Sequence, residues 1–288
     1  MANNLLKGKR GIIFGALDEN SIAWKVALKA KEEGATFVLT NAPIALRAKK
    51  IFELAEMTNS EVIPADITQV DELENLLTES MAVLGGKIDF ILHSVGMSPN
   101  VRKGLHYTEL DYNHMVKTLD VSAISLHKLL QVAYHMDAIS EWGSVIAMSY
   151  IGSQRTYSSY SDMSQAKAML ESIVRSFGYH YGRKKKVRIN SISQSPTVTT
   201  AGTGVKGFKS FYAYANSMSP LGNATSDSCA DYCVVMFSDL TKMVTMQNLF
   251  HDGGYSTMGI SDEVMDNCFV CDDEECKAKK IEKIVRKK

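Results

Sequence analysis

The chain has 288 residues, of which 45% are hydrophobic and 22% charged, the composition of an ordinary globular protein. Lysine plus arginine equals aspartate plus glutamate at 32 each, which argues against a general electrostatic affinity for nucleic acid. The N-terminus lacks the apolar core of a signal peptide, and no stretch approaches the ~20 apolar residues of a membrane span, so we expect a cytoplasmic protein with no membrane partner. The five cysteines are then expected to be reduced thiols.

Short apolar runs alternate with longer amphipathic segments along the chain. The apolar runs predict strands covered on both faces, at residues 10–15, 35–40, 61–65, 88–96, 143–149, 187–193 and 247–254. Helical patterns lie between them, at residues 21–34, 44–58, 69–84, 111–138, 157–181 and 226–239. This alternation predicts a single α/β domain over about residues 1–260, a Rossmann-type, doubly wound, parallel seven-stranded sheet. Residues 261–288, an acidic block followed by a basic one, are predicted to form a C-terminal extension.

A glycine directly follows the first predicted strand, in the stretch "FGALDENSIAW". Gly15 could take a backbone conformation closed to other residues, and Ser21 could cap the next helix while its hydroxyl reaches a phosphate. The full G-x-G-x-x-G fingerprint is absent, so a plain strand-to-helix turn explains this stretch alone equally well. Asp66, and Ser94 with Gly96 in "HSVG", also fall at strand ends, where they could contact adenine and ribose. Together these positions predict a dinucleotide site at the carboxyl edge of the sheet.

The stretch "YSSYSDMSQAK" places a tyrosine and a lysine seven residues apart. In a helix, Tyr160 and Lys167 would lie on one face, roughly 10 Å apart along the axis. For an isolated helix, a packed tyrosine and a solvated lysine would be the simpler interpretation.

Taken together, these motifs resemble those of the short-chain dehydrogenases/reductases and, more narrowly, the NADH-dependent enoyl-acyl-carrier-protein reductases of bacterial fatty-acid synthesis. "GALDENSIAW" resembles that family's modified glycine turn, with Ser21 and Ile22 in place of a third glycine, and "HSVG" replaces a conventional Asn-Asn-Ala-Gly. Conventional members have the catalytic tyrosine four residues before the lysine, where this chain has Met163. Tyr160 instead matches the enoyl reductase pattern Tyr-x6-Lys, and Tyr150 matches a second, outer tyrosine.

The resemblance implies NADH-dependent reduction of the trans-2 double bond of an enoyl thioester on acyl carrier protein. Tyr160 would donate a hydrogen bond to the enolate oxygen, and Lys167 would stay charged and hold the nicotinamide ribose. Tyr150 would either orient the substrate or simply pack. Cofactor contacts are implied for Gly15, Ser21, Ile22, Asp66, Ile67, Ser94, Gly96, Lys167, Thr197 and Thr199.

A mobile flap over the acyl chain is implied at residues 199–218, lined by Phe208 and Met218. Lys206 and Lys209 are three residues apart on this flap, and either dock the acidic carrier protein or are merely solvated. Just before it, Ser195 stands where the family has a glycine, a residue with more backbone freedom.

Cofactor choice and assembly are less strongly indicated. After the second strand, Asn41 is neutral and Arg47 lies farther into the helix, which favours NADH and leaves NADPH open. The family's usual assembly is a homotetramer.

Cysteines 268, 271 and 276 form C-x2-C-x4-C without a second pair, so we expect no metal. The rival hypotheses are a carbonyl or 3-ketoacyl thioester reductase of the same fold and a non-catalytic, nucleotide-binding relative.

Overall fold

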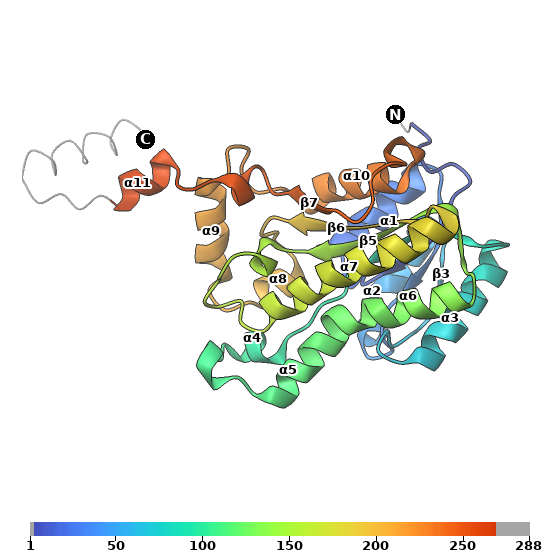
Figure 1. Cartoon of the computed structure of the whole chain (residues 1–288), viewed down its shortest axis with the longest axis horizontal. Coiled ribbons are helices and arrows are strands. Elements are labelled where there is room, and N and C mark those ends of the chain that lie inside the picture. The colour runs from blue at the N-terminus through green and yellow to red at the C-terminus, as the bar shows by residue number, and fades with distance from the viewer. Residues whose placement is uncertain (1–2, 269–288) are drawn as a thin grey trace, which may run out of the picture.

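The computed structural model describes residues 3–268, and its elements alternate along the chain as predicted (Figure 1). The strands are β1 (Arg10–Phe14), β2 (Thr36–Thr40), β3 (Glu61–Val62), β4 (Ile88–His93), β5 (Ile139–Ser149), β6 (Arg188–Gln194) and β7 (Asn248–His251). The α-helices are α1 (Ile22–Glu32), α2 (Lys50–Thr58), α3 (Val70–Leu84), α4 (Pro99–Lys103), α5 (Tyr112–Leu119), α6 (Ser125–His135), α7 (Met163–Lys185), α8 (Thr200–Thr203), α9 (Phe208–Met218), α10 (Ser226–Phe237) and α11 (Asp262–Cys268). A π-helical turn, η3 (Asp120–Ile124), joins α5 to α6.

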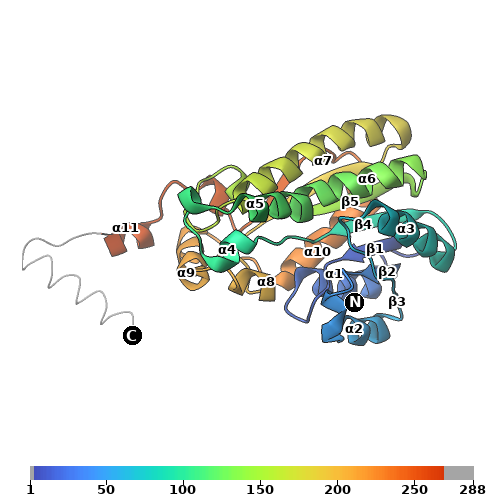
Figure 2. The ribbon, with the colours of Figure 1, turned by 90° about the horizontal axis from the view of Figure 1, so that it is seen from below.

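All seven strands run parallel in one sheet of order β3-β2-β1-β4-β5-β6-β7. Helices α3, α6 and α7 cover one face of the sheet, and α1, α2 and α10 cover the other (Figure 2). The predicted Rossmann-type, doubly wound fold is therefore confirmed. Strand order reverses between β1 and β4, so ligands of such a fold bind at the carboxyl ends of these two strands.

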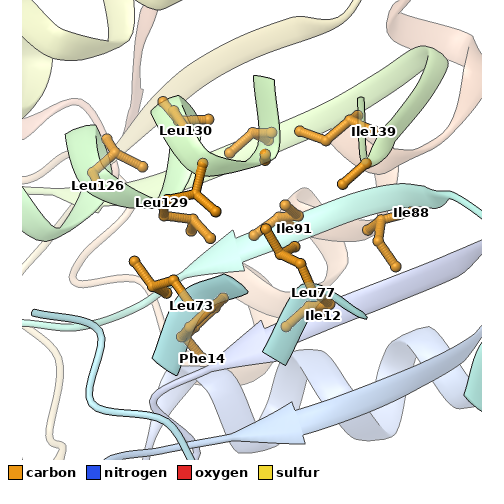
Figure 3. Close-up of a cluster of buried hydrophobic side chains, with 14 of the residues drawn as sticks. Ile12, Phe14, Leu73, Leu77, Ile88, Ile91, Leu126, Leu129, Leu130 and Ile139 are labelled. Carbon is orange, nitrogen blue, oxygen red and sulfur yellow. The ribbon is translucent and has the colours of Figure 1, made fainter. Parts of the chain in front are cut away.

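The core beneath that edge is largely aliphatic. Figure 3 shows Ile12 and Ile91 of the central strands meeting Leu77 of α3 and Leu129 of α6, and all four side chains are fully buried. Burying a side chain of this size stabilises the fold by about 1.5–3 kcal/mol. The strand ends and the loops that follow them are thus held on a rigid base.

Several predicted boundaries are wrong for local reasons. The helix predicted at 44–58 is broken at Lys49, which has φ +60° and separates the 3-10 turn η1 (Ala45–Ala48) from α2. The helix predicted at 111–138 contains the π-turn η3, and the one predicted at 157–181 begins only at Met163. Helix α4 was not predicted at all, because five residues opened by a proline carry no hydrophobic period.

The predicted extension is described only as far as α11. Cys268 ends that helix, while Cys271 and Cys276 of the cysteine motif lie outside the described residues. Within residues 3–268, no helix is both long and apolar enough to cross a membrane.

Candidate active site

The glycine turn after β1 meets the end of β4 at the point where strand order reverses. Gly15 has φ +92°, and a Cβ added there would overlap the carbonyl oxygen of Ser94. A left-handed backbone and a close approach of two strand ends therefore both select glycine at this position. The structure brings the predicted Gly15 and Ser94 together, and they form a cradle that a side chain would fill.

Ser21 is the N-cap of α1, as predicted. Its Oγ donates to the carbonyl oxygen of Asp18 at 2.7 Å and accepts the Trp24 N–H at 3.4 Å. A hydroxyl has one proton, so in this arrangement Ser21 holds the turn rather than donating to a phosphate. The N–H groups of the first turn, beginning with Ile22, have no partner within the helix, and such groups bind anions.

Asp66 lies four residues beyond the end of β3. Its Oδ1 accepts the N–H of Thr68 at 2.9 Å and the Thr68 hydroxyl at 2.8 Å. Among the described residues no donor reaches Oδ2, which is therefore a suitable acceptor for an amino group such as that of adenine. The side chain of Ile67 is buried in the core, so only the Ile67 backbone could contact a cofactor.

Lys167 projects from α7 beneath Gly96. The side chain is 6% exposed, and its Nζ donates to the carbonyl oxygen of Met148 at 2.7 Å and lies 3.7 Å from the Cβ position of Gly96. Burial lowers the pKa of Lys167 to about 8, and the carboxylate of Glu171 partly opposes that shift. At pH 7 the ammonium is therefore still mainly charged, and it faces the loop where a ribose was predicted.

An aromatic cluster centred on Tyr150 includes Tyr160 at the same edge of the sheet. The Tyr150 ring lies 5.0 Å from that of Tyr160, 5.4 Å from that of Tyr157 and 5.6 Å from that of Phe211 in α9. Burial raises the pKa of both Tyr150 and Tyr160, so both phenols stay protonated and able to donate. The Tyr150 hydroxyl is buried and has no hydrogen-bond partner among the described residues, whereas Tyr160 is only partly buried.

Tyr160 is not on the helix that carries Lys167, contrary to the prediction. The Tyr160 N–H donates to the Tyr157 carbonyl oxygen at 3.0 Å. The Met163 N–H donates to the Tyr160 carbonyl oxygen at 3.2 Å. Ser161 has φ +50°, which no α-helix allows, and α7 begins two residues later. A tight turn, rather than two turns of helix, therefore sets the direction of the Tyr160 side chain.

A buried carboxylate that the sequence did not reveal holds this turn. Asp162 is fully buried and accepts from Ser98 Oγ at 2.6 Å, Asn100 Nδ2 at 2.8 Å and Thr118 Oγ1 at 2.9 Å. These partners lie between 44 and 64 residues away in the sequence, so no local pattern could indicate them. The hydrogen bonds tie the Tyr160 turn to the start of α4 and to α5.

A second buried carboxylate joins α7 to the end of β5. Oε1 of Glu171 accepts from the hydroxyls of Ser149 and Ser153, each at 2.6 Å. Glu171 follows Lys167 by one helical turn, so the same residue fixes the tip of β5 and places negative charge near the ammonium.

The predicted flap consists of α8 and α9, and its side chains fit the prediction in part. Phe208 and Met218 are buried. Thr199 caps α8 by accepting the Gly202 N–H at 2.9 Å, and the Thr197 hydroxyl donates to the Ser195 carbonyl oxygen at 2.9 Å. Ser195 itself has no positive φ, so the replacement of the family's glycine is accommodated without strain.

The two flap lysines do not share a helical face. Lys206 precedes α9, and Gly207 between it and the helix has φ +80°. The Lys206 side chain instead lies across α4, where a Cβ added at Gly104 would meet its Cδ at 2.5 Å. Lys209 is on α9, and both lysines are exposed.

A glycine cradle at the switch point and a tyrosine and buried lysine beyond it define a nicotinamide-dependent oxidoreductase of the short-chain dehydrogenase/reductase class. Residues 15–256 match the family model described as enoyl-(acyl carrier protein) reductase. The chain belongs to that family, as its motifs predicted.

Individual relatives agree with this assignment. The chain is 31% identical over 257 residues to enoyl-[acyl-carrier-protein] reductase [NADH] 2 of Rhizobium meliloti, covering 88% of this chain and 94% of the relative. The FabI of Rickettsia bellii, with the same NADH designation, is 32% identical, with 90% and 98% covered. The solved FabI–NADH complex from Alistipes finegoldii superposes with a TM-score of 0.88 at 61% identity, covering 90% of this chain and 91% of that chain. A Bacillus cereus enoyl reductase solved with NADP+ superposes at 0.83 with 28% identity, covering 90% and 100%.

Proposed function

We propose that this chain reduces the trans-2 double bond of enoyl-acyl-carrier-protein thioesters with NADH, in fatty-acid biosynthesis. The observation that carries the proposal is the placement of Tyr160 and Lys167 at the end of β5, where the Tyr160 ring packs on that of Tyr150 and the buried Lys167 ammonium bonds to the Met148 carbonyl oxygen. The NADH-dependent activity predicted from the sequence agrees with the names of the relatives.

The residues at the switch point fit a dinucleotide. The Gly15 cradle and the N–H groups at the start of α1, including that of Ile22, would hold the pyrophosphate. Oδ2 of Asp66 and the Ile67 backbone would contact adenine, and Ser94 and Gly96 would lie along the ribose. Ser21, the N-cap of α1, would hold the glycine turn in shape. The Thr197 backbone would contact the nicotinamide amide, and Thr199 would contact the pyrophosphate.

Catalysis by the protein is then a matter of placing donors. NADH, when bound, would supply hydride to the β-carbon of the substrate, and a proton from water added to the α-carbon would complete the saturated thioester. As negative charge develops on the thioester oxygen, Tyr160 donates its hydroxyl proton into a hydrogen bond with that oxygen. Lys167 keeps one N–H on the Met148 carbonyl oxygen and offers the others to the nicotinamide ribose, while its charge favours the enolate. Tyr150 supports the Tyr160 ring by packing.

The rival reaction, reduction of a ketone, needs a proton donor four residues before the lysine. Met163 occupies that place, and its sulfur only accepts, from the Ser122 hydroxyl at 3.7 Å. The structure therefore favours enoyl over carbonyl reduction.

Carrier protein, assembly and compartment complete the proposal. The enoyl chain would arrive on acyl carrier protein, docked in part by Lys206 and Lys209. We propose a homotetramer, in which the groove of about 450 Å³ between α6 and α7 would be covered by another copy. Its lining includes the aromatic rings of Tyr134 and Phe177. A cytoplasmic location suits this activity, and light scattering of the purified protein tests the assembly.

The activity is tested by following oxidation of NADH, and separately of NADPH, with a trans-2-enoyl thioester and with a 3-ketoacyl thioester. Tyr160→Phe should lower kcat on the enoyl substrate by about 10²–10³-fold, the usual cost of losing one oxyanion donor. Tyr179→Phe is the matched control, because Tyr179 is an exposed tyrosine of α7 outside the aromatic cluster. Turnover of only the ketoacyl substrate, or nucleotide binding without turnover of either, would refute the proposal.

A further inference from the structure

Helix α4 is attached at both ends to parts of the proposed active site. At its start, Ser98 caps the helix and donates to Asp162, two residues after Tyr160. At its end, Gly104 lies under the side chain of Lys206, which belongs to the flap. Helix α4 therefore links the Tyr160 turn to the loop between α8 and α9, the two flap helices that Figure 2 shows near it.

The last turn of α4 carries two exposed cations, Arg102 and Lys103. Neither forms an ion pair with any residue in the described part of the chain, and the same is true of the flap lysines 206 and 209. The acid that senses Lys103 is Asp111, whose carboxylate caps α5 through the N–H groups of Asn113 and His114. The end of α4 and the flap thus present four cations that have no ion-pair partner within the part of the chain that the structure describes.

We propose that the end of α4 is a second half of the docking surface for the acidic acyl carrier protein, complementing the flap lysines. The inference rests on the proposed function and extends it from the flap to a separate element. Its basis is position: the cations lie beside the flap and on the helix tied to the Tyr160 turn, where a protein delivering a tethered thioester must come close. Cations at the rim of such an interface act mainly on the association rate and on its dependence on salt.

The test compares three thioesters of the same enoyl chain, carried on acyl carrier protein, on coenzyme A and on N-acetylcysteamine. The variant is the double substitution Arg102→Gln, Lys103→Gln, which removes charge but keeps polar side chains. Lys206 is left intact because its aliphatic stem packs on Gly104. The control is Lys7→Gln, Lys31→Gln, where Lys31 is likewise a basic residue in the last turn of a helix, α1, away from the carboxyl edge of the sheet.

We expect the α4 variant to lower kcat/KM for the carrier-protein substrate by about 3–10-fold at low ionic strength, with the difference shrinking in high salt. The N-acetylcysteamine substrate should change less than about 2-fold, and the control variant should leave all three substrates unchanged. An equal loss on all three would mean that α4 was distorted, and a loss on coenzyme A as large as on carrier protein would assign the cations to phosphate. Either result, or no loss on the carrier protein, would overturn the docking inference. Failure of the unmodified enzyme on every thioester would instead refute the proposed function.

Discussion

Replacement of Asp162 by alanine should destabilise the protein more than any substitution of an exposed aspartate. The carboxylate is fully buried and accepts three hydrogen bonds. Thr118 also donates to the His114 carbonyl oxygen at 2.8 Å, so its hydroxyl would keep a partner. Ser98 would lose the acceptor for its proton, and Nδ2 of Asn100 would keep only its bond to the Asp111 carbonyl oxygen, while its Oδ1 would still accept the Asp111 N–H.

Two buried donors would thus be left without acceptors. Each costs about 1–3 kcal/mol, which gives about 2–6 kcal/mol for Asp162→Ala, reduced by whatever the buried charge itself costs. Asp162→Asn should cost less than Asp162→Ala, because its amide can donate to Ser98 Oγ while its oxygen still serves Asn100 and Thr118. The Ser98 proton and the second amide proton of the asparagine would then lack acceptors.

Thermal melts followed by circular dichroism, at one protein concentration, measure this order. The control is Asp71→Ala, an exposed aspartate in the first turn of α3, whose loss should cost about 0.3–1 kcal/mol. If Asp162→Ala had the same melting temperature as Asp71→Ala, the free-energy cost of burying the carboxylate would equal the stabilisation from its hydrogen bonds. That result would refute the reasoning.

The same residue should affect catalysis through Tyr160. Because Asp162 fixes the turn two residues after the tyrosine, Asp162→Asn should lower kcat on every enoyl thioester while leaving KM for NADH nearly unchanged. In a Tyr160→Phe background, Asp162→Asn should have little further effect, since the hydroxyl that it positions is already gone. Equal fold losses in both backgrounds would show that Asp162 supports only the fold.

Further predictions concern a glycine and two ionisable groups. Gly152→Ala places a methyl 2.8 Å from the Tyr160 ring and 2.9 Å from the Tyr150 ring, so kcat should fall at least about 10-fold while NADH binding, measured by fluorescence titration, is retained. For Lys167, whose pKa is lowered from 10.5 to about 8, the unfolded chain binds the extra proton between these values. The stability of the cofactor-free enzyme relative to Lys167→Met should therefore rise as pH increases through that window, and parallel denaturant titrations would reveal a flat difference if the lysine were solvated. Glu33 shows the opposite case: the Leu5 N–H is the main cause of its lowered pKa, so its stabilising contribution is present above the ordinary value of 4.5 and is lost as pH falls through the folded-state pKa. The deficit of Glu33→Gln at pH 7 should accordingly shrink as pH falls below 4.5, and a deficit that stayed at its pH 7 value in acid would contradict it.

The fold was predictable because its signals are local. Strands buried on both faces are mostly apolar, so β1, β2 and β4 stand out in the sequence, and the alternation with amphipathic segments leaves few topologies. The turn at Gly15 was also predictable, because a glycine directly after such a strand usually marks a tight turn or a close approach of the backbone. The exact ends of the elements were harder to predict. Single residues such as Lys49 and Ser161 adopt left-handed conformations that their residue types do not indicate.

The site was predictable only where chemistry is tied to residue identity. The pairing of Tyr160 and Lys167 followed from a family pattern, yet the helical geometry assumed for it was wrong, because the tyrosine sits in a turn. Asp162 was missed for a different reason: its role depends entirely on partners brought together by the fold. An isolated aspartate near a helix start is ordinarily a cap, and nothing in the sequence distinguishes a buried one.

The attachments of α4 allow the roles of its two ends to be separated by experiment. A helix of five residues has no stability of its own, so its position is set by Asp162 at one end and by the flap at the other. Substitutions at Asp162 act on the Tyr160 turn and must therefore affect all thioesters alike, whatever carries them. Substitutions of Arg102 and Lys103 change surface charge without touching that turn, so their effect must depend on the carrier. If the Arg102 and Lys103 substitutions instead affected all thioesters alike, the position of the α4 backbone, rather than its charge, would determine activity.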